Sequence, residues 1–198
     1  MSNLKKYAEE NYVPIIMDDG LDLLIETIKT NNSKTILELG TAIGYSSINI
    51  AKTSSDINIV TLERNQDLYN QAKENIYNEN LQNQITMYNI DIDDFSTDKI
   101  FDFIFIDAAK SQYSKHLEKF LPNLSDDGIV LFDNISFHGM VEDPSKCISR
   151  NKRQLVRKIR EFRDSVLEDE RFCCDFKPDV GDGIIILRRR KWWNLVNL

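Results

Sequence analysis

The chain has 198 residues, of which 41% are hydrophobic, and its formal net charge is −7. This length allows one well-buried core but not two ordinary domains, so we expect a single domain over residues 1–198. The acidic balance argues against a protein that holds polyanions by its overall charge, although it leaves room for a local basic patch.

No segment of the sequence predicts export or membrane insertion. The N-terminal residues lack the apolar core of a signal peptide, and no run reaches the roughly 18 apolar residues of a membrane span. The cysteines, Cys147, Cys173 and Cys174, have no metal-ligand spacing and are expected to be reduced thiols. We therefore expect a cytoplasmic protein.

Short runs rich in β-branched residues alternate with longer segments of helical period, which is typical of strand–helix units around a mostly parallel sheet. Asp18 and Asp19, ahead of apolar residues spaced three and four apart, predict a first helix. We therefore expect an α/β, doubly wound, Rossmann-like sheet. The predicted strands are residues 35–39, 58–62, 85–89, 101–106 and 128–132, and the predicted helices between them are residues 46–53, 66–80 and 112–121.

The pattern changes after the fifth predicted strand. Pro178, Gly181 and Gly183 predict the turn of an antiparallel hairpin between two late strands. The tail, residues 191–198, is too apolar for a free end, so we expect it to dock on the body or on a second subunit. The late elements are a polar segment, a long helix and two strands, at residues 136–151, 152–167, 172–177 and 183–188.

A glycine-containing loop joins the first predicted strand to the next helix. The sequence ILELGTAIGYSS places Glu38, Gly40 and Gly44 there. Glycine at such a turn lets the backbone approach a ligand closely, and open α/β sheets bind ligands at the carboxyl ends of their strands. The alternative is a purely structural turn, since the fold requires one here in any case.

Acidic residues follow the second and third predicted strands. Glu63 lies at the tip of the second strand, where an acidic side chain accepts hydrogen bonds from ribose hydroxyls. An NAD-binding domain would share this geometry, but Ala42 replaces the middle glycine of its usual motif. A nucleoside cofactor without a pyrophosphate, such as S-adenosylmethionine, fits better. Asp91, after the third strand, stands where adenine contacts occur, or it is a solvated helix cap.

Polar residues also end the fourth and fifth predicted strands. Asp107 closes the fourth, and Asp133 and Asn134 close the fifth. Neighbouring parallel strands end at the same edge of a sheet, so three hard oxygen ligands converge there, a set that suits Mg²⁺ or Mn²⁺. A single Asp here is often only a helix cap, but two consecutive polar residues closing a buried strand are costly unless they are paired or bind something. We therefore predict a divalent-metal site.

Lys110, three residues beyond Asp107, is the candidate general base. A lysine beside a divalent cation has its charged form disfavoured, as a base acting near neutral pH requires. In the predicted chemistry, two vicinal substrate oxygens chelate the metal, Lys110 takes the hydroxyl proton, and the oxyanion attacks the sulfonium methyl in line. The alternative is a solvated surface lysine.

Together these motifs resemble the cation-dependent O-methyltransferases related to catechol and caffeoyl-CoA O-methyltransferases. The resemblance runs from about Tyr7 to Arg188 and rests on ELGTAIGYS, TLER, FIDAAKSQY, FDN and VGDG. It implies a class I methyltransferase sheet and a homodimer. The implied metal ligands are Asp107, Asp133 and Asn134, the implied base is Lys110, and the implied cofactor contacts are Ile16, Glu38, Gly40, Ser46, Glu63, Asp91 and Asp107.

Within that family the sequence is most similar to bacterial tRNA 5-hydroxyuridine methyltransferases, through YAEENYVPI, IDAAKSQY and MVEDPSK followed by a basic stretch. This similarity implies methyl transfer to the 5-hydroxyl of 5-hydroxyuridine in tRNA, giving 5-methoxyuridine. That hydroxyl lies beside the O4 carbonyl, so the base can chelate a metal much as a catechol does. The expected tRNA contacts are basic residues of the stretch 146–163, namely Lys146, Arg150, Lys152, Arg153, Arg157, Lys158, Arg160 and Arg163.

Three alternatives stay open. In the first, the basic charges are only the solvated face of a helix whose apolar stripe packs on the sheet. In the second, the acceptor is a small catechol-type molecule over which residues 136–151 close. In the third, the chain is a silent nucleotide-binding or RNA-binding module, although the intact metal and base candidates argue against it. The stripe in question consists of Leu155, Ile159, Phe162 and Val166.

Overall fold

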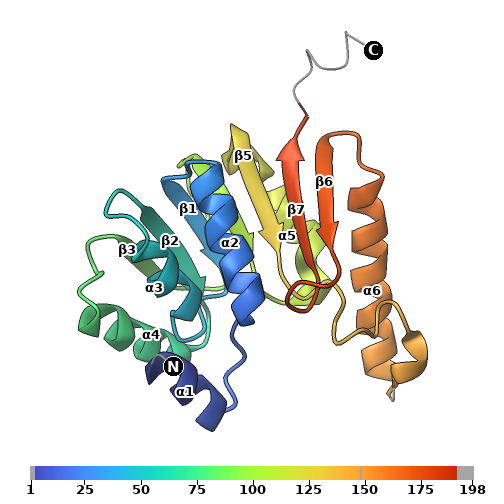
Figure 1. Ribbon diagram of the computed structural model, residues 1–198, viewed down its shortest axis with the longest axis horizontal. Helices are drawn as coiled ribbons and strands as arrows, with labels where there is room; N and C mark the ends of the chain where they lie inside the picture. Colours follow the sequence, from blue (N-terminus) through green and yellow to red (C-terminus); the bar gives the residue numbers. More distant parts are fainter. Residues whose placement is uncertain (1–2, 148, 191–198) are drawn as a thin grey trace.

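The computed structural model describes residues 3–147 and 149–190, and the apolar tail whose docking the sequence predicts lies outside those residues (Figure 1). The six α-helices in this part of the chain are α1 (Asn3–Glu10), α2 (Asp18–Thr30), α3 (Tyr45–Ala51), α4 (Gln66–Asn78), α5 (Tyr113–Phe120) and α6 (Arg150–Leu167). The strands are β1 (Thr35–Leu39), β2 (Asn58–Glu63), β3 (Ile85–Asn89), β4 (Phe101–Ile106), β5 (Leu124–Phe132), β6 (Phe172–Lys177) and β7 (Ile184–Arg189). Three short 3₁₀ helices are η1 (Lys110–Gln112), η2 (Leu121–Asn123) and η3 (Pro144–Lys146).

The strands form one sheet in the order β3-β2-β1-β4-β5-β7-β6. The first five pair in parallel, while β7 pairs antiparallel with both β5 and β6. The α/β doubly wound fold and its C-terminal antiparallel hairpin are therefore confirmed. The strand order reverses between β1 and β4, which is the point where open α/β sheets bind their ligands.

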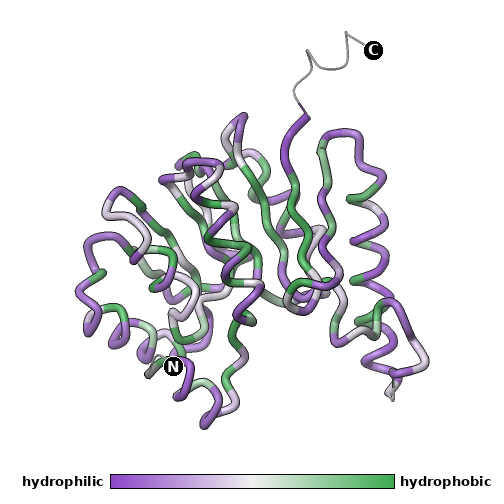
Figure 2. Tube along the Cα trace, viewed as in Figure 1, coloured by the Kyte–Doolittle hydropathy of each residue, from purple (hydrophilic) through white to green (hydrophobic). Residues whose placement is uncertain are grey.

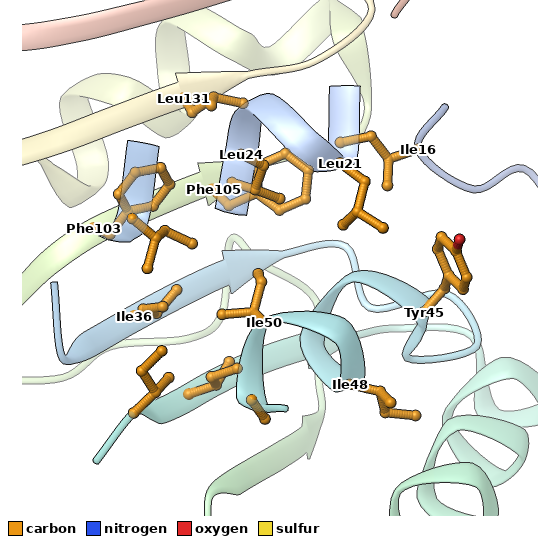
Figure 3. Packing of buried hydrophobic residues seen from close by; sticks show 14 of the residues in the cluster. Ile16, Leu21, Leu24, Ile36, Tyr45, Ile48, Ile50, Phe103, Phe105 and Leu131 are labelled. Atoms are coloured by element: carbon orange, nitrogen blue, oxygen red, sulfur yellow. The ribbon is translucent and has the colours of Figure 1, made fainter. Parts of the chain in front are cut away.

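Two apolar layers cover the two faces of the sheet. On one face, α2, α3 and α4 bury residues such as Leu24, Ile48 and Ile76 against the sheet, with α3 and α4 over β2 and β3. Figure 3 shows Leu21 and Leu24 of α2 facing β1 and β4. On the other face, α5 and α6 pack through Tyr113 and Phe162. Helices on both faces explain why the strands carry nearly continuous apolar runs, which Figure 2 shows as green segments.

The predicted bounds lie within two residues of the observed ones, except at the start of β5. Strand β5 begins at Leu124, four residues before the predicted start, and α6 begins at Arg150 because the Ser149 hydroxyl accepts a hydrogen bond from the Lys152 amide at 3.3 Å. The predicted apolar stripe of α6 also needs one correction. Val156 is buried at its start, whereas Leu155 is only half-buried.

The segment predicted as simply polar, residues 136–151, carries apolar anchors of its own. Val141 and Cys147 are buried against Val156 and Ile159 of α6 and form a small separate core. This segment is therefore held on the body at the edge where the parallel strands end (Figure 1). None of the helices in the described ranges is long and apolar enough to cross a membrane.

Gly40 brings the loop after β1 against the end of β4. Its φ is +105°, and a Cβ at this position would overlap the carbonyl oxygen of Asp107. The Gly40 amide also donates to the Leu62 carbonyl at 3.1 Å, which ties the loop to β2. Only glycine combines this backbone conformation with this close approach.

We predict that Gly40→Ala destabilises the fold by about 3 kcal/mol or more, because it adds a collision with Asp107 to the cost of a positive φ. Gly44→Ala is the matched control. Gly44 also has a positive φ, of +82°, but a Cβ there would meet the Ala72 Cβ at an ordinary 3.5 Å. Its cost should be about 1–2 kcal/mol. Urea unfolding of both variants measures the difference, and equal costs would contradict the role assigned to the close approach.

Candidate functional site

A cleft of about 200 Å³ lies at the carboxyl ends of β1, β2, β3 and β4. It brings together three of the predicted cofactor residues, Gly40, Glu63 and Asp91. A larger groove of about 460 Å³ between α4 and β3 contains none of the predicted site residues. The other residues that line the strand-end cleft are Leu62, Arg64, Ile90, Ile92, Asp93, Ala108, Ala109, Gln112 and His116.

The Glu63 carboxylate holds the glycine-containing loop through hydrogen bonds from backbone amides. One oxygen accepts a hydrogen bond from the Ala42 amide at 2.9 Å, and the other accepts one from the Asn65 amide at 2.8 Å. Ala42 has a φ of +47°, and this hydrogen bond helps to hold that uncommon conformation. The side chain still borders the cleft, so the ribose contact stays a prediction.

Asp91 lines the cleft and also stabilises a local turn. Its Oδ1 accepts a hydrogen bond from the Asp93 amide at 2.9 Å, which is the local turn geometry of the cap alternative. Its Oδ2 lies 3.5 Å from an Arg64 guanidinium nitrogen, and the residue lines the cleft. The adenine contact therefore stays a prediction with suitable placement.

Glu38 lies deeper than the sequence suggests. Its side chain is fully buried, and its carboxylate accepts hydrogen bonds from the hydroxyls of Ser46, Ser47 and Thr61. Burial raises the Glu38 pKa to about 7, against the opposing effect of the three hydroxyls. Glu38 does not line the cleft, so in this structure it braces β1, β2 and α3 beneath it.

Two further predicted cofactor residues also lie outside the cleft lining. Ile16 is 4% exposed and packs in the core ahead of α2, near Leu21 (Figure 3). Ser46 is buried, and its hydroxyl donates a hydrogen bond to the Glu38 carboxylate. The assignment of both as cofactor contacts stays a prediction.

The structure places Asp107, Asp133 and Asn134 together at the ends of β4 and β5. Asp133 is only 1% exposed, and its pKa is raised to about 7 by burial first and by the nearby Asp107 charge second. Burial also raises the Asp107 pKa, while Lys110 opposes that shift. The Asn134 amide donates to Asp133 Oδ1 at 2.7 Å, and its φ is +59°. One buried carboxylate, Asp133, and one partly exposed carboxylate, Asp107, therefore share one small region.

Lys110 lies beside this pair. Its Nζ is 3.7 Å from Asp107 Oδ1, and its side chain is only 21% exposed. The residue belongs to η1 rather than to the helix that follows, because a short 3₁₀ turn precedes α5. A solvated surface lysine would be more exposed, so the placement agrees better with a role at the site.

The donor set fits a divalent cation. Two carboxylates and an amide oxygen are hard ligands, and a cation would relieve the repulsion that raises the pKa of Asp133. No three His, Cys, Asp or Glu side chains converge as a metal site within residues 3–147 and 149–190, so Asn134 is needed to complete the set. The metal itself belongs to the proposal below.

Sequence reasoning missed residues that the tertiary structure brings to the site. Asp182 lies next to the acidic pair, and its charge helps to raise the Asp133 pKa. The buried Tyr113 hydroxyl donates to the Asp133 carbonyl at 2.7 Å. The VGDG motif contains Asp182 and could have pointed to this residue. The sequence alone does not predict which residues this aspartate contacts.

The basic residues of the stretch 146–163 divide into two groups. Arg160 donates from Nε to the Val141 carbonyl at 3.1 Å, and Arg163 pairs with Glu142 at 3.5 Å, so both serve the local structure. Another group is exposed and forms no ion pair within the part of the chain that the structure describes. That group consists of Lys146, Arg150, Lys152, Arg153 and Lys158, whereas Arg157 belongs with the paired residues because its Nε lies 3.5 Å from Glu161 Oε1.

Comparison with known proteins gives consistent matches. The family model described as O-methyltransferase matches residues 1–190. A caffeoyl-CoA O-methyltransferase from Populus kitakamiensis is 25% identical over 194 residues, which cover 93% of this chain and 82% of that protein. A Staphylococcus aureus structure, provisionally named a caffeoyl-CoA O-methyltransferase, is 38% identical with a TM-score of 0.90 and covers 94% of this chain and 90% of its own. A Bacillus cereus O-methyltransferase solved with S-adenosylhomocysteine is 25% identical with a TM-score of 0.79, covering 94% and 89% of the two chains.

The raised pKa of Glu38 predicts how stability depends on pH. The folded state holds this proton more tightly than the unfolded chain, so the free energy of unfolding should fall as pH rises from the ordinary value of 4.5 to about 7. The Glu38 contribution is roughly 3 kcal/mol at most. Glu38→Gln should remove this part of the slope and leave the part due to Asp107 and Asp133.

Urea unfolding at several pH values, without metal or cofactor, measures the effect. Asp126→Asn removes an exposed carboxylate on β5 and controls for the simple loss of one negative charge. An unchanged slope in Glu38→Gln would show that the buried carboxyl does not titrate in this range.

Proposed function

The chain belongs to the O-methyltransferase family, and from this membership we propose that it moves the methyl group of S-adenosylmethionine to one of two neighbouring oxygens of its acceptor, with a divalent cation at Asp107, Asp133 and Asn134. The chain is an S-adenosylmethionine-dependent O-methyltransferase of the caffeoyl-CoA O-methyltransferase type. One observation carries the finer proposal. The acidic pair Asp107 and Asp133 adjoins the strand-end cleft, because Gly40, which lines the cleft, packs directly on Asp107.

A small catechol-type molecule is the acceptor that we propose first. The relatives named above include a caffeoyl-CoA O-methyltransferase, and these similarities support the small-molecule alternative better than the tRNA acceptor that the sequence analysis favoured. A vicinal pair of oxygens suits a site that offers two carboxylates and one amide on one side. The segment 136–151 borders this side of the site (Figure 1).

Each residue of the chain has a defined task in this proposal. Residues of the strand-end cleft bind and orient the nucleoside part of S-adenosylmethionine, including Glu63 and Asp91. When bound, the cation would polarise the acceptor oxygens and lower the pKa of the reacting hydroxyl. Lys110, in its neutral amine form, takes the proton from that hydroxyl on Nζ, and its proximity to Asp107 keeps it beside the acceptor. The acceptor oxygen then attacks the methyl carbon in line, as the sulfur leaves with the bonding pair.

Methyl transfer from labelled S-adenosylmethionine to a small catechol tests this function. We expect transfer that requires Mg²⁺ or Mn²⁺ and stops under strict chelation. Lys110→Met should lower kcat by about 10²–10⁴-fold, because it removes the proton acceptor. Asp133→Asn should abolish turnover while S-adenosylhomocysteine still binds in calorimetry. Unchanged activity under chelation would contradict the cation-assisted chemistry.

The second candidate acceptor is 5-hydroxyuridine in tRNA. The observation that favours it is the exposed basic group described above, in which Arg150 and Lys152 lie in the first turn of α6, nearest the segment that follows Asn134, and Lys158 lies midway along the helix. Contacts with phosphates would make binding fall with salt. Basic residues on an exposed helix face are equally well explained as a solvated surface. A measurement of methyl transfer to each acceptor therefore has to decide between the two.

The two acceptors are separated by offering hydroxyuridine-containing tRNA and a small catechol under identical conditions. If tRNA is a substrate, the triple variant Arg150→Glu, Lys152→Glu, Lys158→Glu should lose tRNA methylation by at least about tenfold and keep catechol turnover. If the catechol alone is methylated, the same variant should behave like the wild type. Sedimentation of the full chain tests the implied homodimer separately.

A further inference from the structure

The backbone that follows β5 is held in an uncommon conformation. Asn134, Phe137 and His138 have φ values of +59°, +45° and +57°. Such values are uncommon for non-glycine residues, and several of them close together are a recurring feature of functional sites. The stretch from 135 to 141, which we call the acceptor-side segment, therefore needs contacts that hold it.

The β6–β7 loop, residues 178–183, supplies those contacts. The Ile135 amide donates to the Gly183 carbonyl at 2.8 Å, and the Ser136 amide donates to the Asp182 carbonyl at 2.8 Å. The Asp182 side chain adds a third hydrogen bond, because its Oδ1 accepts from the His138 amide at 2.6 Å. Hydrogen bonds to a charged acceptor are stronger than neutral ones.

The Asp182 carboxylate is nearly buried, and it makes few other polar contacts. Its side chain is 10% exposed, and Oδ2 lies 3.6 Å from His138 Nδ1, too far for a hydrogen bond. Oδ2 and the Ser136 hydroxyl are buried without a hydrogen-bond partner among the residues that the structure describes. The Asp182 carboxylate is the only hydrogen-bond acceptor for the His138 amide among the residues that the structure describes.

The same loop also touches the acidic pair and the start of α2. A Cβ at Gly181 would lie 3.6 Å from Asp133 Oδ1, and the Gly181 amide donates to Asp19 Oδ2 at 2.9 Å. At the far end of the segment, the Val141 carbonyl accepts the Arg160 hydrogen bond described above. The segment is thus held between α6 and a loop that itself rests on α2.

We propose that Asp182 is a positioning residue for the methyl acceptor: its hydrogen bond to the His138 amide holds the acceptor-side segment in place beside Asp133 and Asn134. The proposal rests on the proposed function, since it places the acceptor at those residues. It predicts that Asp182 affects acceptor binding and leaves cofactor binding unchanged, because Gly40, Glu63 and Asp91 lie at the other part of the site.

Three variants of the full chain test this inference. Asp182→Ala removes the acceptor of the hydrogen bond. Asp182→Asn keeps a side-chain oxygen that can accept from the His138 amide. Asp179→Ala removes an exposed carboxylate from the same loop and is the matched control. The measurements are acceptor KM and kcat, S-adenosylhomocysteine affinity, thermal stability and trypsin cleavage after Lys146 and Arg150.

For Asp182→Ala we expect acceptor KM to rise about tenfold, the effect of losing one hydrogen bond to a charged group. The kcat and S-adenosylhomocysteine affinity should stay within about twofold, and trypsin cleavage should become several-fold faster. Asp182→Asn should restore most of the KM and protease resistance, and Asp179→Ala should match the wild type.

Opposite results would overturn the inference in distinguishable ways. Unchanged KM and protease resistance in Asp182→Ala would show that the hydrogen bond positions nothing. Equal losses of cofactor affinity, acceptor affinity and thermal stability would show a merely structural role. If Asp182→Asn behaves like Asp182→Ala, the proposed hydrogen bond is not the cause. Wild-type protein that methylates no catechol and no tRNA would refute the proposed function, while the protease arm would still test the contact itself.

Discussion

The site depends on the close approach of two strand ends, at Gly40 and Asp107. Parallel strands β1 and β4 lie side by side at the point where the strand order reverses, so their following loops diverge and leave a crevice. Because Gly40 has no side chain, the loop after β1 packs directly on the Asp107 carbonyl. The cofactor cleft and the acidic pair thereby share one wall, which is the geometry that transfer between two bound molecules requires.

The molecule handles buried carboxylates in two different ways. Glu38 is surrounded by three hydroxyl donors and is satisfied within the fold. Among the residues that the structure describes, the Asp133 carboxylate accepts one hydrogen bond, from the backbone amide of Asn134, and it faces the charge of Asp107. The first arrangement braces the sheet, whereas the second stores repulsion that a bound cation would relieve. Burial alone therefore does not distinguish a structural carboxylate from a reactive one; the partners do.

The acceptor side is built from the late part of the chain. Strand β7 inserts antiparallel beside β5, and this brings the β6–β7 loop against the segment that leaves β5. The family matches cover this region as well, since the O-methyltransferase model extends to residue 190. In the proposed function, cofactor binding and acceptor binding would therefore depend on different halves of the sequence that meet at one edge of the sheet.

The sequence by itself determined the order and type of the elements. Apolar runs of strand length and helices with three-and-four spacing follow from local chain geometry, and residues placed just after β1, β2, β4 and β5 had to reach the same edge of a parallel sheet. From that rule, the sequence predicted that Gly40, Asp107 and Asp133 lie close together. Only the tertiary structure decided which polar groups are already paired. It buried Glu38 beneath the cleft, used Glu63 to hold Ala42, and placed Asp182 beside Asp133 and His138. These contacts join residues far apart in the chain, and no local periodicity encodes the distance between two such side chains.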